Sequence, residues 1–174
     1  MPTEPTRENY AFAGWYTASS GGSKVTSSTV FTGTRNTTYY ARWSQTFSVT
    51  VPTSLPLVMD QNGNVTGGAA QIVNGSSGNV VVSAVTLRGE NGWKIVPYVT
   101  NMAHQKVDAK VVGFSLNGVA TVKSAEEESL SLTGDWTIPQ SGSLGLDYDA
   151  VVSAVSQAVK SETILSAIFV LKWS

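Results

Sequence analysis

The sequence predicts an all-β fold in which a small hairpin module precedes a β-sandwich. Ser, Thr, Gly, Asn and Val are abundant, while only 13% of the residues are charged, about half the usual share. β-Branched residues fit a pleated sheet, whereas Ser, Asn and Gly compete with helical hydrogen bonds. Short apolar runs recur between turn signals such as Asn–Gly, which is the spacing expected of an all-β domain.

Residues 1–44 are expected to form the hairpin module. The first predicted strand places Phe12, Gly14 and Tyr16 on one face and Ala13, Trp15 and Thr17 on the other. A polar loop with the sequence S-S-G-G-S follows at residues 19–23. The second strand, residues 38–43, places Tyr39, Ala41 and Trp43 on one face and Tyr40 and Arg42 on the other. Because an isolated hairpin is marginally stable, we expect the module to lean on the following domain or to be loosely ordered.

A family resemblance is carried by both ends of this module. The N-terminal end reads P-T-R-E-x-Y-x-F-x-G-W-Y from Pro5 to Tyr16, Gly21 and Gly22 follow, and the C-terminal end reads Y-A-R-W from Tyr40. With these residues, positions 5–43 resemble the internalin-type B repeat, also called the Listeria–Bacteroides repeat. The resemblance implies a small β-grasp-like module of bacterial surface proteins that acts as a spacer or weak protein-binding unit. Because the family's opening strand is not found before Pro5, we expect a partial repeat, its second half only, from a longer chain.

Residues 45–174 are expected to form an immunoglobulin-like β-sandwich with Greek-key connections. The predicted strands are 47–51, 57–59, 64–66, 70–73, 80–87, 93–99, 111–116, 120–123, 130–132, 136–138, 143–152 and 164–173. The last of these is apolar on both faces and is expected to be a central, covered strand. Residues 153–162 carry no decisive pattern. The expected core aromatics are Trp93, Phe114, Trp136, Phe169 and Trp173.

A weaker resemblance links Val82–Ala120 to the WxL domain of Gram-positive cell walls. It is carried by Arg88–Gly89, Gly92–Trp93 and Asn117–Gly118, and it implies association with peptidoglycan. The chain departs from the family motif in that Ile95 and Ile138 stand where the motif has Leu, and no closing W-x-L is found.

Composition excludes several classes of function. A net charge of −1 lacks the basic footprint of a nucleic-acid binder. Without cysteine there is no disulfide, zinc–thiolate site or cysteine nucleophile. No apolar run approaches the roughly 20 residues of a membrane-spanning helix. We therefore expect no cofactor and no membrane span.

The first residues form no signal peptide, and we expect a piece of a longer chain that is extracellular or cell-wall associated, in a Gram-positive-type bacterium.

Exposed aromatic side chains are the candidate binding residues. Trp15, Tyr16, Tyr39 and Tyr40 could form a strip that stacks on sugar rings or anchors a protein, or they could be the module's own core. Asp60, Asn62 and Asn64 form a D-x-N-x-N pattern that resembles a calcium loop. In the calcium loop of an EF-hand, a glycine occupies position six and a Glu position twelve, whereas here the glycine is at position four and position twelve is not Glu. A hairpin turn therefore explains these three residues better than a calcium site.

The remaining reactive side chains predict no catalytic site. His104 has no G-x-S-x-G context to support a triad with Asp108. The adjacent carboxylates Glu126–Glu128 are expected to point in different directions in a solvated loop. An isopeptide bond between one of Lys94, Lys110 and Lys172 and a neighbouring strand, assisted by Asp147 or Asp149, is a further alternative, but no residue spacing identifies it.

These observations predict a non-catalytic bacterial cell-surface protein that serves adhesion, display or cell-wall association through protein contacts at its aromatics and strand edges. The alternative is a carbohydrate-binding module of a secreted multidomain protein. The partner is expected to be a protein or a cell-wall glycan, and the sequence does not identify it.

Overall fold

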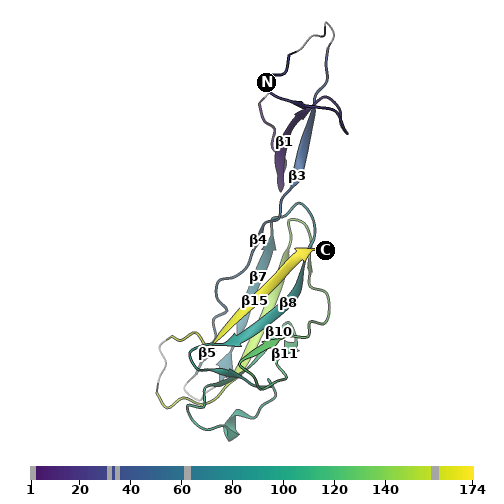
Figure 1. Cartoon of the computed structure of the whole chain (residues 1–174). Helices are drawn as coiled ribbons and strands as arrows, with labels where there is room; N and C mark the ends of the chain where they lie inside the picture. The colour runs from purple at the N-terminus through teal and green to yellow at the C-terminus, as the bar shows by residue number, and fades with distance from the viewer. Residues whose placement is uncertain (1–2, 31–32, 34–35, 61–63, 158–160) are drawn as a thin grey trace.

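The computed structural model describes residues 3–30, 33, 36–60, 64–157 and 161–174. Within these residues, regular structure consists of strands and one short 3-10 helix, η1 (Met102–His104). A three-stranded N-terminal sheet stands on one end of two larger sheets, which pack against each other (Figure 1). The predicted all-β sandwich is thus confirmed.

The N-terminal sheet is antiparallel, with the order β2-β1-β3. Its strands are β1 (Tyr10–Tyr16), β2 (Lys24–Val25) and β3 (Tyr40–Gln45). Phe12 pairs with Trp43 and Gly14 with Arg42, so Ala13 is the extra residue of a β-bulge. The bulge places Phe12 and Trp15 on the same face, whereas strict alternation predicted opposite faces.

The first sheet of the sandwich has the strand order β11-β10-β14-β7-β4, and β9 pairs in parallel with β10. All other pairs in this sheet are antiparallel. The strands are β4 (Val49–Thr50), β7 (Gly68–Asn74), β9 (Lys94–Ile95), β10 (Val111–Leu116), β11 (Val119–Ala120) and β14 (Ser143–Val152).

The second sheet is organised around β8 (Val80–Gly89). On one side, β15 (Leu165–Trp173) pairs with the full length of β8, and on the other side two short strands pair with its two ends. These short strands are β12 (Glu127–Ser129) and β13 (Thr137–Ile138). The chain crosses repeatedly between the two sheets, for example from β7 to β8 and from β14 to β15.

β15 differs from its predicted position. Its two apolar faces predicted a central, covered strand, yet among the described residues it pairs with β8 alone and forms the edge of its sheet. Only one face packs against the core, while Ile168 and Val170 on the other face are 58% and 48% exposed. Burial in the core therefore explains the apolar residues on one face of β15 but not Ile168 and Val170 on the other.

The core lies between the two sheets and receives side chains from both. Its fully buried members include Ile72, Val80, Val82, Val85, Leu87, Ile95, Val112, Leu116, Ile138 and Leu146. The predicted core aromatics Trp93, Phe114 and Trp136 are buried, and Phe169 is half-buried against the core. Trp173 is 41% exposed at the end of β15, where it stacks edge-to-face on Phe47.

Asn–Gly turns lie where the sequence predicted them. Asn91–Gly92 and Asn117–Gly118 adopt positive φ at both residues, the geometry that tight hairpin turns require. The strands β5 (Val58–Met59) and β6 (Val65–Thr66) form the predicted hairpin, although its turn at Asn62–Gly63 lies outside the described residues. In the segment 153–162, positions 158–160 also lie outside them.

Candidate functional site

One face of the N-terminal sheet is a small aromatic cluster. The Phe12 ring contacts Trp15 and Trp43 edge-to-face, with ring centroids 5.6 and 5.5 Å away. Trp15 also pairs across strands with Val25, which is only 4% exposed. The Trp15 indole N–H is buried without a hydrogen-bond partner. Trp15 therefore packs inside the module, and its polar atom is not presented to a ligand.

The opposite face carries Tyr16, Tyr40 and Arg42. Tyr16 and Tyr40 are direct cross-strand partners, and the Arg42 guanidinium lies 4.1 Å from the centre of the Tyr16 ring. Arg42 also donates to the carbonyl oxygens of Ala18 and Gly21, which fixes the glycine-rich loop. Of these side chains Tyr40 is the most open, at 40% exposed.

Gly14 makes this second face possible. Its φ is +125°, and a Cβ added there would lie 2.5 Å from Cε of Lys24, which crosses over it. The four predicted aromatic residues are therefore not one strip. Trp15 lies on one face, Tyr16 and Tyr40 on the other, and Tyr39 is half-buried just before β3.

The calcium candidate is organised as a turn. Asp60 accepts hydrogen bonds from the backbone N–H and the side-chain amide of Asn64, each at 2.9 Å, and its own N–H donates to the Asn64 carbonyl. Asn62 lies outside the described residues. Among the residues that the structure describes, no cluster of three or more His, Cys, Asp or Glu side chains could hold a metal.

The three adjacent glutamates have separate environments. The Glu128 carboxylate is buried and accepts from the backbone N–H groups of Val122 and Lys123, at 3.0 and 3.3 Å. Glu126 is exposed and pairs with Lys94 at 3.6 Å, and Glu127 is also exposed. This arrangement ties a loop to the sheet.

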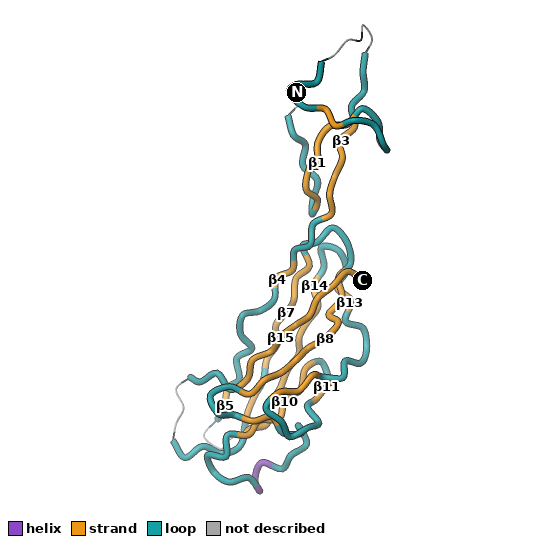
Figure 2. The backbone as a smooth tube through the Cα atoms, viewed as in Figure 1, coloured by secondary structure: helices purple, strands orange, loops and turns teal. Residues whose placement is uncertain are grey.

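The histidine lies at the far end of the molecule. η1, which ends at His104, is at the end of the sandwich remote from the N-terminal sheet (Figure 2). Nearby, Asp108 accepts a hydrogen bond from the Ser156 backbone N–H at 2.8 Å. Hydrogen bonding to the Ser156 side chain first, and to its backbone N–H second, lowers the pKa of Asp108. Asp108 therefore closes a loop.

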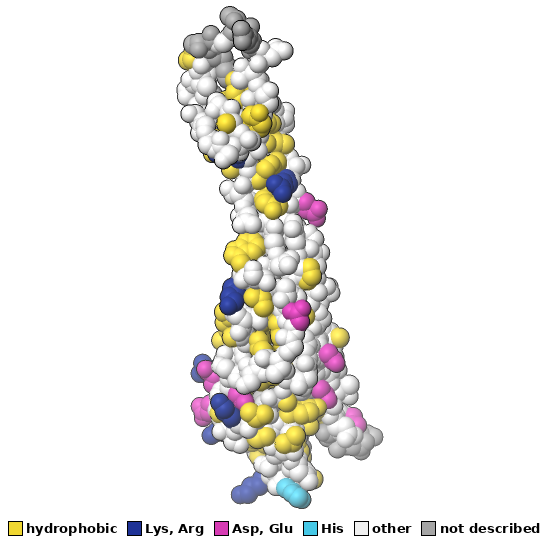
Figure 3. All heavy atoms as spheres, turned by 90° about the vertical axis from the view of Figure 1, so that its right-hand side faces the viewer, with side chains coloured by type: hydrophobic (Ala, Val, Ile, Leu, Met, Phe, Trp, Pro, Cys, Tyr) yellow, Lys and Arg dark blue, Asp and Glu magenta, His cyan; other side chains and the backbone are white. Residues whose placement is uncertain are grey.

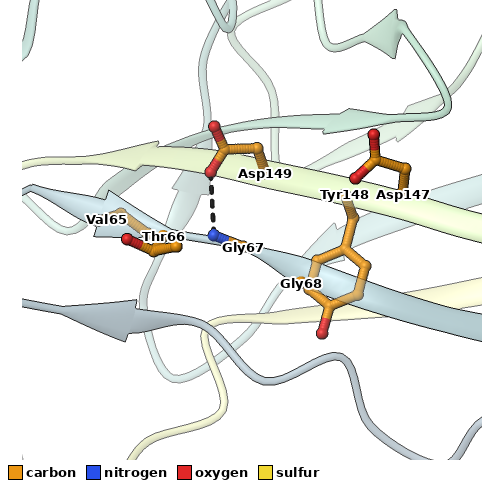
Figure 4. A pocket seen from close by; sticks show the side chains of 7 residues that line it. All are labelled: Val65, Thr66, Gly67, Gly68, Asp147, Tyr148 and Asp149. Carbon is orange, nitrogen blue, oxygen red and sulfur yellow. Dashed lines mark hydrogen bonds between the residues drawn. The ribbon is translucent and has the colours of Figure 1, made fainter.

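A shallow hollow of about 360 Å³ lies at the corner between β6 and β7 (Figure 4). Asp149 accepts from the Gly67 N–H and the Tyr98 hydroxyl, each at 3.1 Å. Burial first, and the hydrogen bond to Asp149 second, raise the pKa of Tyr98. The Tyr148 hydroxyl in turn donates to the Pro56 carbonyl. The Asp149 carboxylate thus holds a strand corner in place.

The lysines considered for an isopeptide bond have other neighbours. Lys110 donates to the Asn91 carbonyl at 3.0 Å and pairs with Glu162 at 3.2 Å. Lys94 pairs with Glu126 in solvent. Within the part of the chain that the structure describes, neither lysine forms a hydrogen bond or ion pair with Asp147 or Asp149.

The N-terminal sheet contacts the sandwich at a polar joint, and the sequence patterns did not predict which residues form it. We call this contact, between residues 9–10 and 46–48 on one side and 74–78 and 141 on the other, the joint. The Asn9 amide donates to the Ser141 hydroxyl at 2.7 Å, the Tyr10 hydroxyl donates to the Ser77 carbonyl at 3.2 Å, and the Thr46 hydroxyl donates to the Asn9 carbonyl. The first two bonds therefore hold the beginning of β1 against the sandwich, and the third ties β1 to the connecting segment.

The connecting segment itself is also fixed. The Ser77 N–H donates to the Thr46 carbonyl at 3.0 Å, and the Gly75 N–H donates to the Ser48 carbonyl at 2.8 Å. The Ser76 and Ser77 hydroxyls accept from the N–H groups of Ser48 and Thr46. Ser and Thr are abundant throughout the sequence, so nothing in the sequence pattern indicated that these particular residues would contact each other.

Asn74 stabilises the sandwich side of the joint. It is 1% exposed, and its side-chain amide donates to the carbonyls of Gly78, Ile138 and Pro139 at 2.9–3.0 Å. Its carbonyl oxygen accepts from the Ser76 N–H at 2.8 Å. One buried side chain therefore orients the turn that receives the N-terminal sheet.

The surface carries few charges. On the face drawn in Figure 3, basic and acidic side chains are sparse and interspersed along the length of the molecule. None of the helices in the described part of the chain is long and apolar enough to cross a membrane.

A comparison with protein families identifies the first part of the chain. Residues 1–42 match the model of the Listeria-Bacteroides repeat domain, which confirms the resemblance predicted for residues 5–43. Searches of curated proteins and of solved structures found no match to the chain. The N-terminal part of this protein is therefore similar to the Listeria-Bacteroides repeat, a type of domain associated with bacterial surface proteins.

Proposed function

We propose that this protein is a non-catalytic, extracellular or cell-wall-associated spacer and display module that acts through protein contacts. The observation that carries the proposal is the joint, because a surface repeat is hydrogen-bonded end-on to a sandwich rather than tethered by a free linker. Such a joint keeps the aromatic module at a fixed distance and orientation from whatever carries the sandwich.

The environments of the reactive side chains support a non-catalytic role. The carboxylates of Glu128, Asp149 and Asp108 accept hydrogen bonds from backbone N–H groups. Catalytic groups, in contrast, converge on a common reacting atom. We therefore assign these carboxylates to the support of loops and corners.

Surface location is tested on intact cells of the source bacterium. Trypsin applied to whole cells is expected to release peptides of this chain, since exposed Lys106 and Arg7 offer cleavage sites. A cytosolic protein measured in the same samples controls for lysis. Recovery of the peptides only after cells are broken would contradict the proposed location.

The fixed joint is tested in solution with isosteric variants. Tyr10→Phe combined with Thr46→Val removes two hydroxyl donors of the joint without changing side-chain shape. We expect NMR relaxation to show one tumbling unit for the wild type and faster motion of the N-terminal sheet in the variant. Tyr40→Phe with Thr66→Val is the matched control, because Tyr40 in β3 and exposed Thr66 in β6 lie outside the joint. Independent tumbling in the wild type would contradict the proposal.

A carbohydrate-binding module is the second candidate, favoured by the exposed Tyr40 beside the Tyr16–Arg42 stack. A glycan array probed with the whole chain distinguishes it. Binding to a defined glycan that is lost in Tyr40→Ala supports this alternative. Trp15→Ala is not a suitable variant, because Trp15 packs in the aromatic cluster.

A further inference from the structure

β15 is the longest edge strand among the described strands of the sandwich. It has nine residues and pairs with β8 along its whole length, and no described strand pairs with its other side. The other edge strands β4, β9, β11, β12 and β13 have two or three residues each, and β4 covers its neighbour β7 only at Val73 and Asn74. A long edge presents a row of backbone N–H and C=O groups to which another strand can bond.

This edge lacks the features that usually protect an exposed strand. Proteins blunt edges with proline, lysine, short strands or bulges. β15 contains no proline and a single charged residue, Lys172. Its bulge falls on the partner strand, since Val170 pairs with Ala84 and Leu171 with Val82, which leaves Ser83 as the extra residue of β8. The backbone of β15 therefore stays regular.

The side chains beside the edge are apolar. Ala167, Phe169 and Leu171 pack against the core, and Ile168 and Val170 on the other face are about half-exposed. Exposed apolar groups that flank an open edge favour contact with another strand over contact with water.

From these features we infer that β15 pairs antiparallel with β15 of a second copy, with Phe169 at the two-fold axis. In this register Ile168 faces Val170 of the second copy, and Ala167 faces Leu171. The single charge, Lys172, faces the hydroxyl of Ser166, so no like charges are opposed. The net charge of −1 adds little repulsion between copies.

The self-pairing closes at two copies. A two-fold interface uses the same surface on both partners, and each copy offers one nine-residue edge strand among the described strands. The pairing joins the two β8–β15 sheets into one continuous sheet. Because the contact is small, we expect a dissociation constant on the order of 10–100 µM.

The first test is sedimentation velocity over a range of protein concentrations. We expect the wild type to dimerise and Ile168→Lys to remain monomeric, because the new charge lies across from Val170 and near Lys172 of the second copy. Val99→Lys is the matched control: Val99 is 90% exposed in a loop, and this variant should dimerise like the wild type. Circular dichroism should show both variants folded.

The second test determines the register by disulfide cross-linking. Because the chain contains no cysteine, any disulfide must form between the introduced residues. In the inferred register, residue 168 of one copy lies opposite residue 170 of the other. An oxidised equimolar mixture of Ile168→Cys and Val170→Cys should give several-fold more disulfide dimer than either variant alone, because identical positions lie too far apart to bridge. A wild type that stays monomeric, a dimer that survives Ile168→Lys, or equal cross-linking in all three samples would overturn the inference and leave the edge to a strand of another protein.

Discussion

The core of the sandwich is closed to solvent, whereas most hydrophobic side chains of the N-terminal sheet are half-exposed. Ile72, Val85 and Ile138 in the sandwich have no exposed surface, while in the N-terminal sheet Val25 is the buried hydrophobic residue among those described. Burial of apolar surface is the main favourable contribution to folding. The N-terminal sheet therefore depends on aromatic edge-to-face contacts and on the joint, and the sandwich holds itself together.

The strongest test of this comparison is Ile72→Ala in the sandwich. Removing a fully buried side chain leaves a cavity, and we expect a loss of about 2–5 kcal/mol in the free energy of unfolding, measured with urea. Val73→Ala is the neighbouring control, because Val73 is 39% exposed and should cost under about 1 kcal/mol. Equal costs would mean that the core does not dominate stability.

Asn74→Ala tests whether the sandwich supports the N-terminal sheet through the buried amide. The change leaves the carbonyls of Ile138 and Pro139 without this donor and frees the Ser76 N–H, so we expect a loss of about 3 kcal/mol in unfolding free energy. Hydrogen exchange should also accelerate at the joint. Asn79→Ala, at an exposed position of the same corner, should cost about 1 kcal/mol or less. A similar loss of unfolding free energy in both variants would contradict the role of Asn74 as the main support of the joint.

Phe12→Ala tests the N-terminal sheet alone. It removes both edge-to-face contacts of the aromatic cluster, and we expect a local loss of about 1–2 kcal/mol. Hydrogen exchange should accelerate in β1 and β3 and stay unchanged in β8 and β14. If β8 and β14 also exchange faster, the two regions unfold as one unit and the comparison fails.

Tyr98→Phe gives the smallest expected effect and concerns alkaline pH. The Tyr98 pKa lies above its ordinary value of 10.0, so the folded state holds the phenol proton more tightly than the unfolded state. This contribution to stability is complete below about pH 10 and is lost as the pH rises through the raised pKa. Urea midpoints measured from about pH 8 to about pH 11 should fall less steeply in the variant than in the wild type. Identical slopes would contradict the raised Tyr98 pKa, which burial first and the hydrogen bond to Asp149 second produce.

Local chemistry made much of the fold predictable. The Asn–Gly pairs at 91–92 and 117–118 require positive φ, and both form turns. Large aromatic residues inside β-branched runs, such as Trp93 and Phe114, are buried as expected. The repeat was recognisable because its aromatic and glycine spacings are specific, and the family comparison confirms it.

Features set by long-range pairing were not predictable. The bulge at Ala13 depends on how β1 pairs with β3, and it moved Phe12 onto the face of Trp15. Whether β15 is central or at an edge depends on which strands pair with it, which composition does not reveal. The joint connects Ser, Thr and Asn residues, which are common in this sequence, and the two partners lie up to 132 positions apart, as Asn9 and Ser141 do.

The packing of Phe47 on Trp173 has a mechanical consequence. The two ring centroids are 5.1 Å apart, so the segment leading into the sandwich and the last residues of β15 lie at the same end (Figure 1). Tension between these points pulls across the β8–β15 ladder, along its hydrogen bonds rather than parallel to the strands. Such a pull is expected to break the hydrogen bonds of the ladder one after another from Trp173, at a lower force than a pull parallel to the strands.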